Sequence, residues 1–164
     1  MYNFSRHQSH GDLRLSSARF VAPILHSLFG LQSVFDVGCG DGQWLASFKE
    51  CGVQVVAGVD GPWTHVAKLH IEPNSFSVRD LSEPFDLQRK FSLAMSLEVA
   101  EHVEPQFSKV FVQNMIRHSD VVLFGAAIPF QGGFRHVNER WQSYWADLFA
   151  REGFDLFDIL RYQL

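Results

Sequence analysis

The sequence predicts an α/β fold in which a mostly parallel sheet carries helices on both faces. Short β-branched and apolar runs alternate with longer amphipathic stretches, which is the pattern of strands joined by crossover helices. A glycine-rich turn follows the first of these runs, as expected where a strand leads into a helix. The 164 residues suffice for one core and are too few for two ordinary domains. We therefore expect one domain over residues 1–164, with a helical segment at 1–30 and the α/β core at 31–164.

The first half of the chain predicts three strands and three helices. Apolar residues recur at helical spacing in the N-terminal helix, and Pro23 inside it predicts a kink or a split. Gly30 and Gly52 follow the first two helices, where glycine commonly ends a helix. In order, the expected elements are a helix over 12–29, a strand over 33–37, a helix over 43–50, a strand over 53–59, a helix over 63–70 and a short strand over 76–78.

The second half predicts three more strands, two helices and one long loop. Trp141, Tyr144 and Trp145 share one stripe of the last helix, which we interpret as facing the core. In order, the expected elements are a strand over 92–97, a helix over 105–118, a strand over 120–128, a loop over 131–140, a helix over 141–151 and a sixth strand over 154–160.

Composition and charge exclude several classes of protein. The net charge of -4 gives no reason to expect nucleic acid as a partner, because proteins that bind it usually carry a basic face. The two cysteines, Cys39 and Cys51, have neither zinc-site spacing nor a disulfide framework. The N-terminus is polar, and no apolar run is long enough to span a membrane. We expect a cytoplasmic protein that neither binds nor crosses a membrane.

Glycine occupies three alternating positions directly after the first strand: Gly38, Gly40 and Gly42. Without Cβ atoms the backbone can turn sharply and a ligand can lie against it. A dinucleotide fingerprint would place its third glycine at position 43, which is Gln43, so NAD and FAD are second choices. Asp60 follows at the end of the second strand, about twenty residues later, where a carboxylate can accept hydrogen bonds from ribose hydroxyls. Its alternative role is to cap the next helix.

Four ordered motifs resemble those of class I S-adenosylmethionine (SAM) dependent methyltransferases, which have a Rossmann-like fold. The resemblance is close over residues 33–129, and it continues more loosely through 136–138 and 141–154. It implies methyl transfer from SAM to a small-molecule or sugar-like acceptor, with S-adenosylhomocysteine as the other product. The four motifs are Val34-Phe35-Asp36-Val37-Gly38-Cys39-Gly40-Asp41-Gly42, Gly58-Val59-Asp60, Arg79-Asp80-Leu81 and Leu97-Glu98-Val99-Ala100-Glu101-His102-Val103.

The resemblance implies a cofactor site at the carboxyl edge of the sheet. The glycine turn would approach the methionyl part and the ribose of SAM. Asp60 would accept from the ribose hydroxyls, Asp80 would accept from the adenine amino group, and Leu81 would donate its backbone N–H to the ring. Trp63 lies where it can stack on adenine, and core packing is an equal alternative. The expected cofactor-binding residues are Asp36, Gly38, Cys39, Gly40, Gly42, Asp60, Gly61, Trp63, Asp80, Leu81, Leu97 and Glu98.

His102 and His136 are the candidate catalytic residues. Both follow strand ends at the same edge of the sheet, and histidine has the pKa range that a general base needs. Positioning and desolvation alone can also carry methyl transfer, so neither histidine has to take a proton. Glu98 and Glu101 can bind the methionyl amine or orient a histidine, and alternatively they cap a helix that begins near Glu101. No metal site is expected.

The chain departs from the family at its C-terminal edge. The sheet of class I methyltransferases usually has seven strands, and the seventh is missing here because the sequence stops after the expected sixth. Either the chain is a fragment, or another chain completes the edge, because an uncovered strand edge invites pairing. A homodimer through this edge is the second interpretation. Two other functions are alternatives: a binding module that keeps the fold without turnover, and, less favoured, an NAD-linked oxidoreductase.

Overall fold

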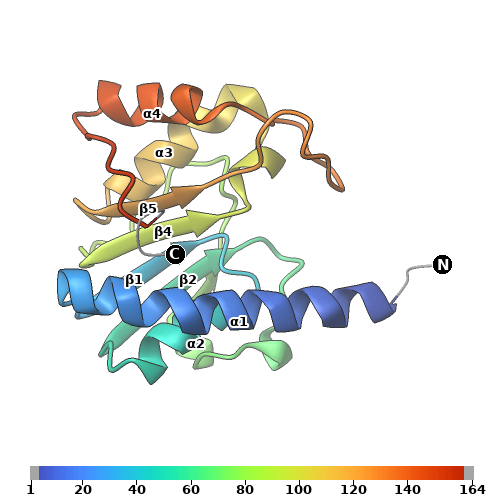
Figure 1. The fold of residues 1–164 in the computed structure, drawn as a ribbon, viewed down its shortest axis with the longest axis vertical. Coiled ribbons are helices and arrows are strands. Elements are labelled where there is room, and N and C mark those ends of the chain that lie inside the picture. The colour runs from blue at the N-terminus through green and yellow to red at the C-terminus, as the bar shows by residue number, and fades with distance from the viewer. Residues whose placement is uncertain (1–3, 161–164) are drawn as a thin grey trace.

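The computed structural model describes residues 4–160 and has a parallel sheet between two layers of helices (Figure 1). The expected alternation of strands and helices holds for most of the chain. The α-helices are α1 (Phe4–Phe29), α2 (Gln43–Glu50), α3 (Ser108–Ile116) and α4 (Gln142–Arg151). The strands are β1 (Ser33–Val37), β2 (Val55–Asp60), β3 (Phe76–Val78), β4 (Leu93–Leu97) and β5 (Val122–Gly125).

The sheet has five parallel strands in the spatial order β3-β2-β1-β4-β5. At the centre, Asp36 of β1 lies opposite Gly58 of β2 and Met95 of β4. Strand order reverses between β1 and β4, and ligands of open α/β sheets bind beyond the carboxyl ends of the strands at such a point. The glycine turn that leaves β1 therefore lies at the expected ligand crevice.

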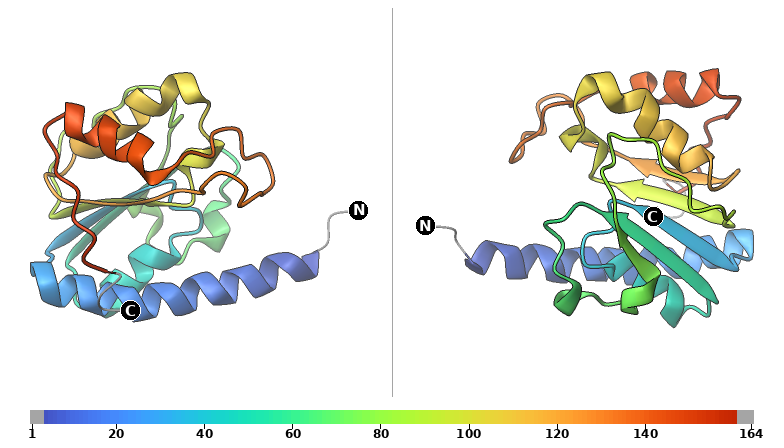
Figure 2. Two further views of the ribbon diagram at one scale, coloured as in Figure 1. Left: turned by 45° about the horizontal axis from the view of Figure 1, so that its top comes forward. Right: turned by 180° about the vertical axis from the view of Figure 1, so that it is seen from behind.

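Alternate side chains of β1 enter two separate cores. Phe35 and Val37 are fully buried among residues of α3 and α4, whereas Val34 is buried among residues of α1 and α2. A period of two is what a strand between two helical layers requires. Figure 2 shows these layers on opposite sides of the sheet.

Helix α1 runs without interruption through Pro23, so the expected split does not occur. It also begins before residue 12, earlier than the pattern of apolar residues indicated. Ala18, Ala22 and Leu25 form a buried stripe on it, and the exposed Arg19 pairs with Glu50 of α2 at 3.1 Å. Burial of this stripe on both sides of the proline offsets the missing backbone hydrogen bond. Among the described residues, no helix is long and apolar enough to span a membrane.

The helix expected over 63–70 is wrong. This segment contains only a single 3-10 turn, Val66–Lys68, and it continues into a second one, Pro73–Ser75. Val66 is 50% exposed and Trp63 is 72% exposed, so the apolar residues of the segment find no core to face. A helix this short is not stable unless its apolar face packs against a core.

The sixth strand expected over 154–160 is also wrong, so the described residues form a five-stranded sheet. Helix α4 ends at Arg151, two residues before Gly153, whose φ of +85° favours glycine, and the chain that follows is irregular. Leu156 and Phe157 are each 76% exposed, whereas Leu160 packs against the core beside α1 and α2. This path carries the segment past β5 without pairing to it (Figure 1).

Candidate functional site

The glycine turn adopts the conformation for which the sequence predicted glycine. Gly38, Gly40 and Gly42 all have positive φ, at +87°, +56° and +81°. A Cβ on Gly38 would lie 2.5 Å from Val99, and one on Gly42 would lie 3.0 Å from Ile71. Packing therefore requires glycine at these two positions. A Cβ on Gly40 would meet no atom within 4 Å, so the middle of the turn is an open cradle.

Asp60, at the end of β2, holds this turn in place. Its two carboxylate oxygens accept hydrogen bonds of 2.6 Å from the backbone N–H groups of Gly40 and Gly61. The side chain is almost fully buried. Because a carboxylate has about four acceptor positions, Asp60 can still accept from a ligand that lies in the turn. Its predicted ribose role stays a prediction.

Asp36 adds a second buried carboxyl group to the cofactor side. It is 3% exposed. Burial, and secondarily the charge of Asp60, raises the pKa of Asp36 to about 8. A cation beside the turn would stabilise the ionised form of this group, and SAM carries both a sulfonium and an amine.

Cys39 packs inside the protein rather than into the cradle. Its Sγ would lie 2.6 Å from a Cβ on Gly58, so the thiol fills the space that this glycine leaves open. Burial raises the pKa of the Cys39 thiol, and Asp36 and Asp60 raise it further. Cys39 is therefore a neutral packing residue, and its backbone is the part that belongs to the turn. Cys39 and Cys51 are both free thiols, as the sequence predicted.

The residues expected around adenine lie at the carboxyl edge of the sheet, and they differ in how far they are exposed to solvent. The indole of Trp63 lies directly over Gly61, where a Cβ would overlap the ring, and it is 72% exposed. The alternative of core packing for Trp63 is therefore wrong, and stacking stays a prediction. Asp80 is exposed and accepts from the N–H of Ser82, whereas the side chain of Leu81 is buried.

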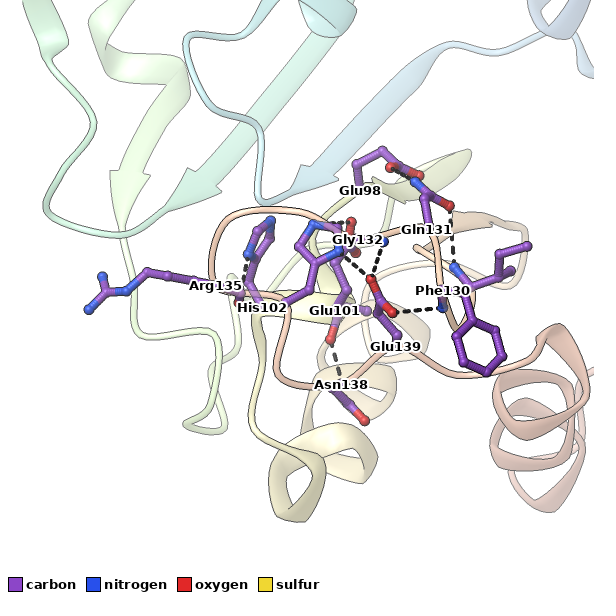
Figure 3. A network of polar contacts seen from close by, with 12 residues as sticks. Glu98, Glu101, His102, Phe130, Gln131, Gly132, Arg135, Asn138 and Glu139 are labelled. Carbon is purple, nitrogen blue, oxygen red and sulfur yellow. Dashed lines mark hydrogen bonds and ion pairs between the residues drawn. The ribbon is translucent and has the colours of Figure 1, made fainter. Parts of the chain in front are cut away.

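A second group of polar side chains follows β4, next to the glycine turn (Figure 3). Leu97 at the strand end is partly buried, and Glu98 has a strained φ of +57° and accepts from Gln131 at 3.1 Å. Glu101, His102 and His136 form a cluster in which one ligand atom of each lies within 4.8 Å of the others. Because Val99 contacts Gly38, this cluster borders the cofactor turn. The sequence had placed these residues at one edge, and the structure brings them together.

Hydrogen bonding sets the tautomers of the two histidines. Nδ1 of His136 lies 3.0 Å from Oε1 of Glu139, and Nδ1 of His102 lies 3.2 Å from the carbonyl oxygen of Arg135. A carboxylate or a carbonyl can only accept, so each Nδ1 carries the hydrogen. In each neutral imidazole Nε2 therefore has the free lone pair.

Glu101 is the unusual member of the cluster. Its side chain is fully buried, yet neither carboxylate oxygen has a hydrogen-bond partner among the described residues. Burial is the main cause that raises the pKa of this carboxyl. Nε2 of His136 is 3.9 Å from Oε1, which is too far for a hydrogen bond. The Glu101 carboxyl and the two imidazoles thus converge without a hydrogen bond between their side chains, which is an arrangement that a proton or a metal cation would satisfy.

Sequence reasoning missed Glu139 at this site, and it also missed the contact of Gly133 with His136. Glu139 accepts from His136, and Gly133 leaves the space in which the His136 ring lies. The spacing of His136 and Glu139 and the pair of glycines at 132 and 133 were visible. Their meaning depends on how the loop folds back on itself, which the pattern does not encode.

Comparison with known proteins identifies the family of the chain from its sequence and the fold from its structure. Residues 6–160 match a family described as a methyltransferase domain. A ubiquinone biosynthesis O-methyltransferase of Rhodopseudomonas palustris (strain BisB18) is 36% identical over 134 residues, which cover 75% of this chain and 46% of that protein. The chain therefore spans less than half the length of this relative.

Two solved structures share the fold. A putative O-methyltransferase from Nostoc punctiforme superposes with a TM-score of 0.71 at 11% identity, over 91% of this chain and 53% of that one. The methyltransferase domain of the bacterial protein CtHen1-C superposes with a TM-score of 0.61 at 20% identity, over 85% and 84% of the two chains. At these identities the likeness extends to the fold alone.

Proposed function

We propose that this chain, which belongs to the family of methyltransferase domains, transfers a methyl group from SAM to a small-molecule acceptor. The observation that carries the proposal is the open cradle at Gly40, which Asp60 holds in place at the point where strand order reverses. One relative is named as a ubiquinone biosynthesis O-methyltransferase, and this name fits a small-molecule class of acceptor.

The residues of the cradle fit SAM better than a phosphate-bearing cofactor. SAM has hydroxyls and amines that need acceptors, and it has no phosphate that would need a lysine or a helix N-terminus. The buried carboxyls of Asp36 and Asp60 supply acceptors on the inner side of the turn, and Asp80 supplies one at the far end. When bound, SAM supplies a methyl carbon that its sulfonium already activates. The protein then has to position the acceptor and exclude water.

If the acceptor is a hydroxyl, we propose that one of the two histidines accepts its proton. His102 is exposed, His136 is half-buried by the loop, and both have a free Nε2. His136→Ala should lower kcat by about 10²- to 10⁴-fold if His136 takes this proton, with SAM affinity nearly unchanged. If His136 only positions the acceptor, KM should rise instead. Wild-type values of both constants would remove His136 from the site.

We further propose that the cluster of Glu101, His102 and His136 can hold a divalent cation, contrary to the expectation of no metal. One carboxylate and two imidazoles are a donor set of transition-metal sites. The unpartnered, buried Glu101 carboxylate favours this interpretation. A cation there would lower the pKa of a bound hydroxyl, so that the histidines act as ligands instead of bases.

Calorimetry and an activity assay separate these functions. Titration with SAM tests the cofactor, and transfer of a labelled methyl group to hydroxylated aromatic compounds tests turnover. Binding of SAM without any transfer would favour a non-catalytic module, and binding of NADH without SAM would favour an oxidoreductase.

Titration with Mn²⁺ and Zn²⁺ tests the cation. His102→Ala and His136→Ala should lose the binding that the exposed variant His65→Ala keeps. Absence of binding to either ion, together with full activity in EDTA, would assign the proton directly to the histidines.

Finally, we propose that copies of the protein pair through the open edge of the sheet in a cytoplasmic setting. β5 has a strand neighbour on one side only among the described residues, and such edges recruit further strands. Sedimentation across a range of protein concentrations tests the pairing. A monomer throughout that range would reject it.

A further inference from the structure

The loop between β5 and α4 is organised around one carboxylate, that of Glu139. Its Oε1 accepts hydrogen bonds from the backbone N–H of Gly132 at 2.8 Å and from Nδ1 of His136 at 3.0 Å. Its Oε2 accepts from the backbone N–H of Phe130 at 3.1 Å. Three donors from different parts of one loop thus share a single side chain (Figure 3).

Only one tautomer of His136 can make the hydrogen bond to Glu139. A carboxylate cannot donate, so Nδ1 of His136 must carry the hydrogen that Glu139 accepts. Nε2 is then left without a hydrogen in the neutral ring, on the side of the ring that faces Glu101. Without Glu139, nothing else among the described side chains that contact His136 would select this tautomer.

Gly133 fixes the position of the ring from the other side. A Cβ at this position would overlap Nε2 of His136, so the imidazole occupies the volume that a side chain would otherwise take. Gly133 has no positive φ, so its backbone does not itself require glycine. The requirement for glycine here comes from the histidine.

The return of the loop is fastened directly to the cluster. The backbone N–H groups of Val137 and Asn138 both donate to the carbonyl oxygen of Glu101, at 2.9 and 3.0 Å. The Asn138 side chain, which is buried, donates to Ser108 at 2.9 Å. Glu139 is the next residue, so its carboxylate starts from a backbone that is held against Glu101.

From these contacts we infer that Glu139 is a positioning residue, which holds His136 as the Nδ1–H tautomer and presents its Nε2 to Glu101 and His102. Whether Nε2 acts as a proton acceptor or as a metal ligand rests on the proposed function. The orientation of the His136 ring is independent of that function. Carboxylates that accept from the second nitrogen of a histidine serve this role in many metal and acid–base sites.

The tautomer can be measured without an acceptor substrate. In protein labelled with ¹⁵N-histidine, long-range ¹H–¹⁵N spectra at a pH where the imidazoles are neutral distinguish Nδ1–H from Nε2–H. We expect Nδ1–H for His136 in the wild type. In Glu139→Gln, one amide oxygen must replace two carboxylate oxygens and the amide can donate to Nδ1, so the population should move to Nε2–H. Glu104→Gln, an exposed change, should leave the spectrum of His136 unchanged.

A second readout follows the position of the ring. Glu139→Gln and Gly133→Ala should each weaken Zn²⁺ binding by about 10- to 100-fold, as is typical when the support of a ligand histidine is removed. If the wild type binds no Zn²⁺, the cation part of the proposed function fails and the tautomer measurement still tests Glu139.

An Nε2–H tautomer in the wild type, or an unchanged tautomer in Glu139→Gln, would overturn the inference. A lower melting temperature of Glu139→Gln with the tautomer unchanged would likewise overturn it, because Glu139 would then be purely structural.

Discussion

Single residues decide whether the turn after β1 is a binding site or only a connection. Gly38 and Gly42 are required by their neighbours Val99 and Ile71, so their presence says little about a ligand. Gly40 has no such neighbour, and its N–H is held by Asp60. An open position in a turn that is otherwise packed is what a cofactor cradle requires.

Gly40→Val should therefore abolish SAM binding while the protein still folds. The valine side chain would fill the cradle, and the positive φ would cost about 1–2 kcal/mol of stability. Gly52→Val is the matched control, because Gly52 also has a positive φ with open space around it and lies at the end of α2. SAM affinity by calorimetry and stability by urea denaturation would show the difference. Equal loss of affinity in both variants would mean that backbone strain, and not the cradle, is responsible.

Asp60→Ala should weaken SAM binding by about 1.5 to 3 kcal/mol, because charge-assisted hydrogen bonds to the ribose hydroxyls are lost. Asp60 also holds Gly40 and Gly61, so the variant alone does not separate these two effects. Comparing the affinities of S-adenosylhomocysteine and its 2′-deoxy analogue for the wild type and for Asp60→Ala separates them. If Asp60 accepts from the hydroxyl, removing both partners should cost less than the sum of the separate losses. Additive losses would assign Asp60 to the turn alone, and Asp120→Ala should change neither affinity.

At the scale of elements, the sequence correctly predicted the buried strands. It wrongly predicted regular secondary structure in two exposed segments. β1 to β5 were recognised because apolar runs such as 33–37 face cores on both sides of the sheet. The segments 63–70 and 154–160 have comparable apolar residues, but nothing covers Trp63, Leu156 or Phe157. A pattern of apolar residues states that a face can be buried, and only the tertiary structure determines whether it is.

The same limit applies to the candidate site. The cofactor residues lie at or just beyond the carboxyl ends of β1 to β4, and parallel strands place these ends at one edge, so their proximity could be predicted. The match over residues 6–160 confirms the family that these motifs indicated. The contacts of Glu139 and Gly133 with His136 depend on three loop residues with positive φ, of which Phe130 and Arg135 are not glycine. Local sequence does not predict such a conformation.

His118, which follows α3, connects that helix to the segment before β4, and this connection should depend on pH. Its buried ring donates from Nδ1 to the carbonyl of Asn114 at 2.6 Å and accepts at Nε2 from the N–H of Leu87 at 2.9 Å. Burial, the largest effect, lowers the pKa of His118. The hydrogen bond to the Asn114 carbonyl and the carboxylate of Asp86 at 3.6 Å offset this in part. The folded protein therefore binds this proton less readily than the unfolded chain.

The stability that neutral His118 provides should be fully present above its ordinary pKa of about 6.5 and should be lost as pH falls below it. His118→Gln should cost about 1–2 kcal/mol at pH 7.5 and should have a flatter dependence on pH between 6.5 and 5. Urea denaturation at several pH values, with the exposed His65→Gln as control, measures both. Parallel curves for the variant and the wild type would contradict the assignment.

At the scale of the whole molecule, the fold concentrates buried acid at one edge of the sheet. β1 and β2 end side by side, so Asp36 and Asp60 come together in the interior, where ionised groups are poorly solvated. A core optimised for stability alone would not place two carboxyls there. Such local costs are typical of binding sites, where the ligand supplies the missing partner.

Asp36 should consequently reduce the stability of the protein as pH rises. Its folded pKa of about 8 lies above the ordinary value of 3.8, so between these values the folded state keeps a proton that the unfolded chain releases. Stability is least affected near pH 4, falls toward pH 8 and stays reduced above it. Asp36→Asn removes this titration, so its free energy of unfolding relative to the wild type should grow from pH 5 to pH 8 by about 1–3 kcal/mol. Urea denaturation of both proteins and of the exposed variant Asp155→Asn tests this. A difference that is constant with pH would show that Asp36 is ionised throughout, and the cation of SAM would then not be needed to stabilise its charge.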